Sequence, residues 1–227
     1  MAQDQEKQIA AEASLKWVHE GQVVGLGSGS TATLAIRALA EKVRAGLKIR
    51  GIPTSQHSRE LALELGIPLI TFEDVQQIDI TIDGADEFDP HLNLIKGGGG
   101  ALLREKIVAS ATRQEIIVTD SSKQVAVLGK FPLPVEVIKF AQPLVAKRIT
   151  ALGAECVLRR DPAGEPYVTD EGNHILDCRF GEIVEPAKLA RRLSEIPGIV
   201  EHGLFISMAS IVLMAKGTEV IELRPPN

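Results

Sequence analysis

Apolar and polar positions alternate in blocks along the first 120 residues, and these blocks predict strands and helices in turn. Short apolar runs bounded by glycine or proline are typical of buried strands, whereas apolar residues three and four apart indicate a helix. Strands are expected at 22–26, 47–52, 67–71, 78–82, 92–95 and 115–119, and helices at 32–43, 59–65 and 101–111. This alternation predicts an α/β fold with an open, mostly parallel sheet that carries helices on both faces.

The pattern changes at the proline-rich segment 131–134, where a second unit begins. From there the expected order is β-α-β-β-α-β, over 135–140, 143–152, 154–159, 174–179, 186–194 and 198–203. That order is typical of a small α+β domain of ferredoxin-like form. Residues 206–223 are expected to form two strands that can return to the first sheet. The expected organisation is a large α/β catalytic domain over 1–130 and 206–227 and a small domain over 131–205.

Composition and charge narrow the classes of partner. The 227 residues include 25 Lys and Arg against 30 Asp and Glu, a net charge of −5, which argues against nucleic acid but not against small anions. The longest apolar stretch, 204–215, is shorter than the roughly 20 residues of a membrane helix. The N-terminal segment has no apolar core typical of a secretory signal. Cys156 and Cys178 form no CxxC pair, which favours a reducing compartment such as the cytoplasm.

Four polar clusters each follow an expected strand, at 25–31, 83–87, 96–100 and 120–123. Ligands of open α/β sheets bind beyond the carboxyl ends of the strands, so the four clusters can converge on one pocket. Lys123 in the fourth cluster would by itself be an ordinary solvated lysine. It becomes a candidate because it shares this edge with the other three clusters.

The first cluster is a glycine-rich turn that opens into a helix. Its backbone amides and the helix N-terminus can bind phosphate, and Ser30 or Thr31 can cap the helix. A plain tight turn with an N-cap is the alternative. A dinucleotide site is disfavoured, because Ser30 stands where the third glycine belongs and no acidic residue follows the strand 47–52.

The second cluster places Asp83 and Asp86 at a strand end. A calcium loop counted from Asp79 fails, because position 12 is Pro90 rather than a glutamate. A solvated acidic loop, a Mg²⁺ site and an acid–base role all remain open at this point.

The third cluster joins Lys96 to four consecutive glycines, 97–100, which let the backbone approach a ligand and bind an anion. The apolar helix that follows surrounds Glu105 with apolar neighbours, which raise the pKa of its carboxyl toward that of a general base. Lys96, Arg104 and the helix N-terminus lower it, and we expect ionisation at neutral pH. An internal ion pair of Glu105 with Arg104 or Lys106 is the alternative.

Together, the segments GLGSGSTA, DGADEFD, KGGGGALLREK and TDSSK resemble the type A ribose-5-phosphate isomerases in order and spacing, over essentially the whole chain. The resemblance implies a Rossmann-like large domain and an aldose–ketose isomerase of the pentose phosphate pathway. It implies no cofactor and no metal, a phosphosugar substrate, no nucleic-acid or membrane partner, and a cytoplasmic homodimer or homotetramer. One departure is Ser28, where the family more often has threonine.

The resemblance also assigns roles to residues. It makes Glu105 the general base that moves a proton between C1 and C2 of ribose 5-phosphate and ribulose 5-phosphate through an enediolate. Asp83 and Asp86 match acids that assist ring opening, and Lys96 lies near the developing oxyanion. The substrate-binding residues it implies are Lys7, Ser28, Gly29, Ser30, Thr31, Asp83, Gly84, Ala85, Asp86, Lys96, Gly97, Gly98, Gly99 and Lys123.

Two alternatives from the same fold remain. One is another phosphosugar isomerase or a lactonase. The other is a sugar-phosphate-sensing regulator, which would add a basic DNA-binding helix-turn-helix that the sequence does not show. The sequence also lacks the GxSxG, HExxH and P-loop motifs of other enzyme classes.

Overall fold

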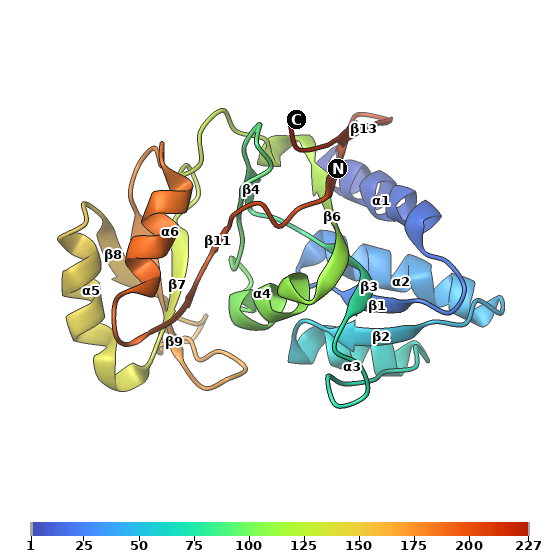
Figure 1. Ribbon diagram of the computed structural model, residues 1–227, viewed down its shortest axis with the longest axis horizontal. Helices are drawn as coiled ribbons and strands as arrows, with labels where there is room; N and C mark the ends of the chain where they lie inside the picture. Colours follow the sequence, from blue (N-terminus) through green and yellow to red (C-terminus); the bar gives the residue numbers. More distant parts are fainter. Residues whose placement is uncertain (1, 227) are drawn as a thin grey trace.

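The larger part of the molecule is built on a six-stranded sheet, seen on the right of Figure 1. The computed structural model describes residues 2–226. The strand order is β13-β12-β6-β3-β1-β2, and all neighbours are parallel except the edge strand β13. The strands are β1 (Val23–Leu26), β2 (Arg50–Pro53), β3 (Ile78–Asp83), β6 (Thr112–Asp120), β12 (Ile211–Lys216) and β13 (Glu219–Leu223).

Helices cover both faces of this sheet because its strands are apolar on both sides. Ile116 and Val118 of β6 pack in the cluster formed with α1 and α2, whereas Ile117 between them packs with Ala109 of α4. The helices are α1 (Ala2–Ser14), α2 (Ser30–Arg44), α3 (Gln56–Glu64) and α4 (Leu102–Ser110). The predicted open sheet with helices on both faces is therefore confirmed.

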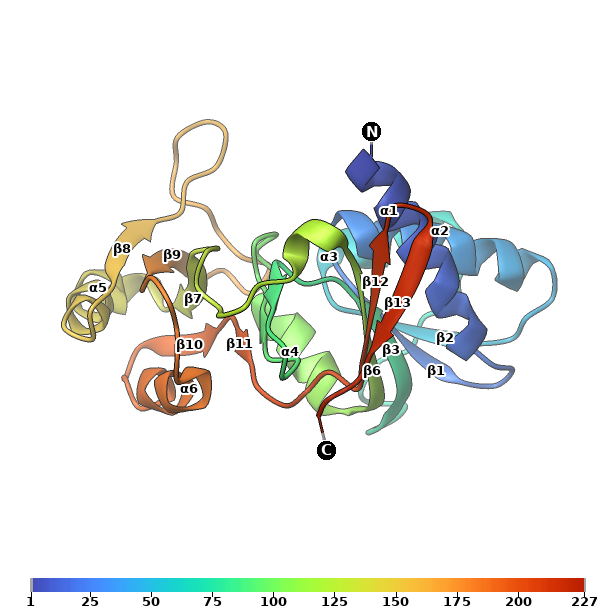
Figure 2. The ribbon, with the colours of Figure 1, turned by 90° about the horizontal axis from the view of Figure 1, so that it is seen from above.

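A four-stranded antiparallel sheet forms the second part, seen on the left of Figures 1 and 2. Its order β10-β7-β9-β8 and its two helices make the predicted β-α-β-β-α-β unit. Both helices pack on one face, through the buried Val145, Ile149 and Leu193. The elements are β7 (Leu133–Val137), α5 (Gln142–Thr150), β8 (Glu155–Leu158), β9 (His174–Arg179), α6 (Pro186–Ser194) and β10 (Ile199–His202).

A small third sheet joins the two parts. It has the order β11-β5-β4, over Leu204–Phe205, Leu94–Ile95 and Glu87–Phe88. Of these, the sequence predicts only the strand around 92–95. Since the third sheet pairs residues from both sides of the proposed boundaries, the domain limits at 131 and 205 stay a prediction.

The expected strand at 67–71 is wrong. This segment makes only an isolated bridge between Leu69 and Gly51 at the edge of the large sheet. Pro68 has no N–H to donate, so a regular ladder cannot extend through it. Within residues 2–226, no helix is both long and apolar enough to cross a membrane.

Candidate active site

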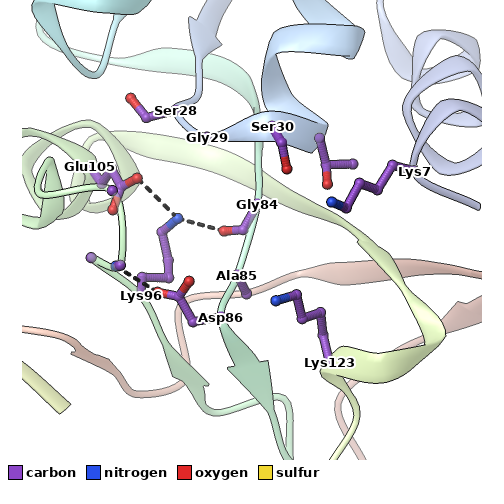
Figure 3. Close-up of a pocket in the computed structure, with 14 residues that line it drawn as sticks. Lys7, Ser28, Gly29, Ser30, Gly84, Ala85, Asp86, Lys96, Glu105 and Lys123 are labelled. Atoms are coloured by element: carbon purple, nitrogen blue, oxygen red, sulfur yellow. Dashed lines mark hydrogen bonds and ion pairs between the residues drawn. The ribbon is translucent and has the colours of Figure 1, made fainter. Parts of the chain in front are cut away.

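The polar clusters meet in one cavity, shown in Figure 3. Three of them follow β1, β3 and β6 of the large sheet, and the glycine-rich segment follows β5 of the third sheet instead. Asp83 does not line the cavity but lies buried directly behind Lys96. All the other predicted site residues line it: Lys7, Ser28, Gly29, Ser30, Thr31, Gly84, Ala85, Asp86, Lys96, Gly97, Gly98, Gly99, Glu105 and Lys123.

The first glycine-rich turn, which follows β1, packs closely against β3. A Cβ atom on Gly27 would lie 2.5 Å from the carbonyl oxygen of Ile82, so only glycine permits this approach. The amide of Ser28 then donates to Asp83 Oδ1 at 3.0 Å. The N-cap of α2 is Gly29, with no side-chain cap, so the prediction that Ser30 or Thr31 caps the helix is wrong. Amides at this helix end are thereby left for an anion.

Lys96 is the centre of the buried charge cluster. Its side chain is only 2% exposed, and its Nζ lies 3.1 Å from Asp83 Oδ2 and 3.5 Å from Glu105 Oε1. It also donates to the carbonyl of Gly84 at 2.5 Å. Burial lowers the pKa of Lys96, but the charges of Asp83, Glu105 and Glu115 outweigh it and raise the pKa above the ordinary value. The lysine is therefore a fixed cation.

Glu105 pairs with Lys96 and with neither neighbour on its helix. Arg104 points to Glu171, with Nε and Oε1 2.5 Å apart, and Lys106 Nζ lies 2.7 Å from Glu201 Oε1. The alternative of an internal pair with Arg104 or Lys106 is therefore wrong.

Burial raises the pKa of Glu105 to about 8; Lys96 opposes this and Asp83 and Asp86 add to it. Burial thus favours the protonated carboxyl, whereas the ion pair with Lys96 favours the ionised form that a base requires.

Asp86 orients the glycine-rich loop. Its Oδ2 accepts the Gly98 amide at 2.7 Å, and a Cβ on Gly98 would lie 2.5 Å from Oδ1. Burial raises the pKa of Asp86, against the opposing Gly98 hydrogen bond and the charges of Lys96 and Lys123. Asp83 Oδ1 accepts two amides, those of Ser28 and Gly84. Both acids are thus committed to protein donors, which favours an orienting or acid–base role over Mg²⁺.

Lys7 and Lys123 reach the cavity from the end opposite Glu105 (Figure 3). Neither ammonium has an ion-pair partner among residues 2–226. Glu6, which the sequence did not single out, anchors α1 here: it accepts the Ser121 amide at 3.0 Å and the Gly217 amide at 2.7 Å. These hydrogen bonds, with that of Gly217 the strongest, lower the pKa of Glu6. The anchor places Lys7 beside Lys123, in a pair suited to a phosphate dianion.

The Ser28 hydroxyl lies close to two hydroxyls that follow β2. Its Oγ lies 2.8 Å from Thr54 Oγ1 and 2.7 Å from Ser55 Oγ, the N-cap of α3. Thr54 and Ser55 were missed; the polar pair directly after β2, at the same sheet edge, was the available signal.

Glu115 is a second buried carboxyl that sequence reasoning missed. It lies in β6 opposite Thr81, is 2% exposed, and its Oε2 has no hydrogen-bond partner within the described chain. Burial and the charge of Asp83 raise its pKa well above the ordinary value, against the opposing charge of Lys96. An acid at the head of an apolar strand, EIIVT, was the available signal.

Glu115→Gln should become more stable relative to the wild type as pH rises. A carboxyl that stays protonated when folded but ionises when unfolded costs stability above its unfolded pKa, at up to about 1.4 kcal/mol per pH unit. Glutamine does not titrate and so escapes this loss. Urea unfolding at pH 5 and pH 7 measures the difference, with the exposed Glu64→Gln as the matched control. If the difference in unfolding free energy between Glu115→Gln and the wild type is the same at both pH values, Glu115 is not protonated in the folded protein.

No group of three or more His, Cys, Asp and Glu side chains arranged to hold a metal ion occurs within residues 2–226.

Comparison with known proteins identifies the family. The model of the family "Ribose 5-phosphate isomerase A (phosphoriboisomerase A)" matches residues 50–219. A protein of Synechococcus sp. (strain JA-3-3Ab) named ribose-5-phosphate isomerase A is 52% identical, over 96% of both chains. One of Sphingopyxis alaskensis with the same name is 49% identical, over 96% of this chain and 95% of its own.

Solved structures agree with the sequences. Ribose 5-phosphate isomerase A of Methanocaldococcus jannaschii is 41% identical, with a TM-score of 0.92 over 96% of this chain and 97% of its own. A D-ribose-5-phosphate isomerase in complex with phospho-erythronic acid is 38% identical, with a TM-score of 0.96 over 99% of this chain and 100% of its own. The chain therefore belongs to the ribose-5-phosphate isomerase A family, the isomerases that interconvert ribose 5-phosphate and ribulose 5-phosphate.

Proposed function

We propose that the cavity carries out this isomerisation by moving one proton between C1 and C2, through an enediolate, with Glu105 as the base. The supporting observation is how the charged groups are distributed along the cavity. At one end the buried Glu105 carboxyl lies 3.5 Å from the buried Lys96 ammonium, and at the other end lie Lys7 and Lys123, which have no ion-pair partner among residues 2–226. One base suffices, because the proton taken from one carbon is returned to its neighbour. A positioned base of this kind contributes about 10²–10⁴-fold.

Lys96 and the amides of the glycine-rich loop stabilise the enediolate oxygen. A preorganised donor at a developing oxyanion is worth about 3 kcal/mol, and Lys96 is fixed by Asp83 and Gly84 before substrate arrives. Asp86 is close enough to this loop to hold a sugar hydroxyl and to assist ring opening. No step requires a metal or a redox cofactor.

The phosphate binds at the other end, between Lys7, Lys123 and the N-terminus of α2. Because it is remote from the reacting carbons, its binding energy orients the sugar rather than driving the chemistry. Ser30 and Thr31 add hydroxyls at the helix end. Phospho-erythronic acid, which a relative binds, carries both a phosphate and a sugar-acid group and should occupy the same cavity here.

Lys123→Ala should raise KM more than it lowers kcat, because a phosphate contact serves substrate and transition state alike. Steady-state kinetics with ribose 5-phosphate measures this. Lys130→Ala, an exposed lysine that does not line the cavity, removes the same charge and is the control. An unchanged KM in Lys123→Ala would remove this lysine from the site.

The assay that tests the proposal compares turnover of ribose 5-phosphate with that of glucosamine 6-phosphate, with and without EDTA. We expect turnover of the pentose alone, and we expect it to survive exhaustive chelation. Preference for the hexosamine would favour the other phosphosugar isomerases of this fold. Loss of activity in EDTA that a divalent ion restores would favour a metal role for Asp83 and Asp86.

We also propose a cytoplasmic homo-oligomer, a dimer or a tetramer. Its support is an apolar patch on the small sheet's side of the molecule, where Phe140 is 96%, Leu144 52% and Ile138 48% exposed. Contiguous exposed apolar groups of this kind mark interaction surfaces. The two thiols, Cys156 and Cys178, face each other unbonded across β8 and β9, which suits a reducing compartment. Sedimentation of the intact chain measures the assembly.

A further inference from the structure

Arg159 reaches from the end of β8 into the glycine-rich loop of the cavity. Its Nη1 donates to the carbonyl of Gly97 at 2.9 Å and to the carbonyl of Gly98 at 3.0 Å. These two glycines line the cavity, but Arg159 itself does not. None of the roles derived above uses this arginine.

The two hydrogen bonds decide where the loop's amides point. In a trans peptide the C=O of one residue and the N–H of the next point in opposite directions. Carbonyls of Gly97 and Gly98 that face Arg159 therefore turn the N–H groups of Gly98 and Gly99 away from it. The Gly98 N–H does point to the cavity side, where Asp86 Oδ2 accepts it at 2.7 Å. The Gly99 N–H is directed to the same side.

The guanidinium is itself fixed. Asp177 in β9 accepts from both Nε, at 3.0 Å, and Nη2, at 2.5 Å, in a bidentate pair. The Tyr167 ring lies 5.9 Å from the guanidinium carbon, and its hydroxyl donates to the carbonyl of Gly99 at 3.4 Å. The arginine side chain is 13% exposed. The Arg159 guanidinium is thus held rigidly and is largely buried, and it connects the small sheet to the glycine-rich loop.

A run of four glycines needs such an external support. Glycine restricts its own backbone less than any other residue, so the loop cannot hold its amides in place by local preference. One hydrogen bond within the loop, from the Gly100 amide to the Gly97 carbonyl at 2.9 Å, fixes part of it. Arg159 adds a constraint from outside the loop, and its positive charge polarises the two peptide groups, which strengthens their N–H groups as donors. Its charge also acts on Asp86, the acceptor of the Gly98 amide.

We propose that Arg159 is a positioning residue of the isomerase, which holds the Gly98 amide on Asp86 and presents the Gly99 amide to the substrate oxygen that becomes negative in the enediolate. This inference rests on the function proposed above. It gives the small antiparallel sheet a direct part in the reaction, through the Asp177–Arg159 pair. Lysine cannot replace Arg159, because a single ammonium cannot serve a bidentate carboxylate and two carbonyls at once.

The test compares Arg159→Ala and Arg159→Lys with the wild-type chain. We expect kcat for ribose 5-phosphate to fall at least about tenfold in both variants, since a single oxyanion donor is worth about 10²–10³-fold. The inhibition constant of inorganic phosphate, which probes the other end of the cavity, should stay within about twofold. Arg160→Ala is the matched control, because the side chain of that neighbour donates to the Gly164 carbonyl of its own loop, away from the cavity, and the change should leave kcat unchanged.

Added guanidinium ion separates positioning from general loosening of the fold. It should restore part of the lost kcat in Arg159→Ala and none in Glu105→Gln. If circular dichroism shows that Arg159→Ala does not fold, Asp177→Asn takes its place. This variant keeps the Arg159 guanidinium but removes the carboxylate that fixes it, and it should still lower kcat.

Three results would overturn the inference: wild-type kcat in Arg159→Ala, wild-type kcat in Arg159→Lys, or weakening of phosphate inhibition in step with kcat. Failure of the proposed function has a different signature. A wild-type chain that does not turn over ribose 5-phosphate would refute the proposed function itself. Wild-type kcat in Glu105→Gln would refute the role of Glu105 as the base, while kcat of the Arg159 variants relative to the wild type would still be measured.

Discussion

Glu105→Gln should lower kcat by at least about 100-fold while substrate binding persists, because a general base contributes about 10²–10⁴-fold. Glutamine has the shape of the protonated carboxyl, the form that burial favours, so the fold should tolerate it. The variant should also stop exchanging the C2 proton of ribose 5-phosphate with deuterated solvent. Kinetics and proton NMR measure the two effects, with the exposed Glu64→Gln as the control.

The pH profile of the wild-type enzyme examines the same carboxyl. Burial raises the pKa of Glu105 to about 8, and only the ionised form accepts a proton. Activity, as kcat/KM, should therefore rise with pH up to that value. If isomerisation and exchange both continue at wild-type rates in Glu105→Gln, this residue is only the ion-pair partner of Lys96. Asp83 or Asp86 then becomes the leading base.

Lys96→Arg should lower kcat sharply, by about 10²-fold or more, although the charge is preserved. The ammonium occupies a closed site between Asp83, Glu105 and the Gly84 carbonyl, and it lies 5.5 Å from the centre of the Phe205 ring. A planar guanidinium is larger and cannot place one donor where the oxyanion forms. Steady-state kinetics, with circular dichroism to check the fold, measures the effect.

Lys96→Met is the companion variant, because its unbranched side chain is only one atom shorter and carries no charge. It should lose at least as much activity as Lys96→Arg. Near-normal kcat in Lys96→Arg would mean that the charge acts only at a distance.

The sequence predicts the parts of the site that depend on local signals. A glycine-rich turn before a helix, acids at a strand end and four glycines after Lys96 each have a short-range pattern, and the sheet edge brings them together. The two sheets were predicted for the same reason, since strand and helix periodicities are local. Local patterns can still fail, as at Pro68: the backbone of this residue has no N–H to donate, and the strand expected at 67–71 does not form.

What the sequence does not predict are the contacts that depend on tertiary packing. Three cations lie near Glu105 in the sequence, and packing decides that Lys96 pairs with it while Arg104 and Lys106 pair elsewhere. Arg159 reaches a loop about 60 residues earlier in the chain. Whether burial or Lys96 dominates the pKa of Glu105 depends on how completely α4 and the sheet exclude water. Ion-pair partners and pKa values of this kind are decided by tertiary packing, and residue spacing in the sequence does not predict them.

The position of β12 has a consequence for how the protein comes into being. This strand, at 211–216, lies inside the large sheet between β6 and β13, and the preceding β11 pairs with β5, directly before Lys96. A ribosome-bound chain therefore lacks both supports until residues 204–216 have been made. Until then β6 presents an open edge, the state in which nascent sheets aggregate. The pairing of β11 with β5, directly before Lys96, thus forms only after residue 205 has been made, and a truncated product released before residue 204 lacks both supports.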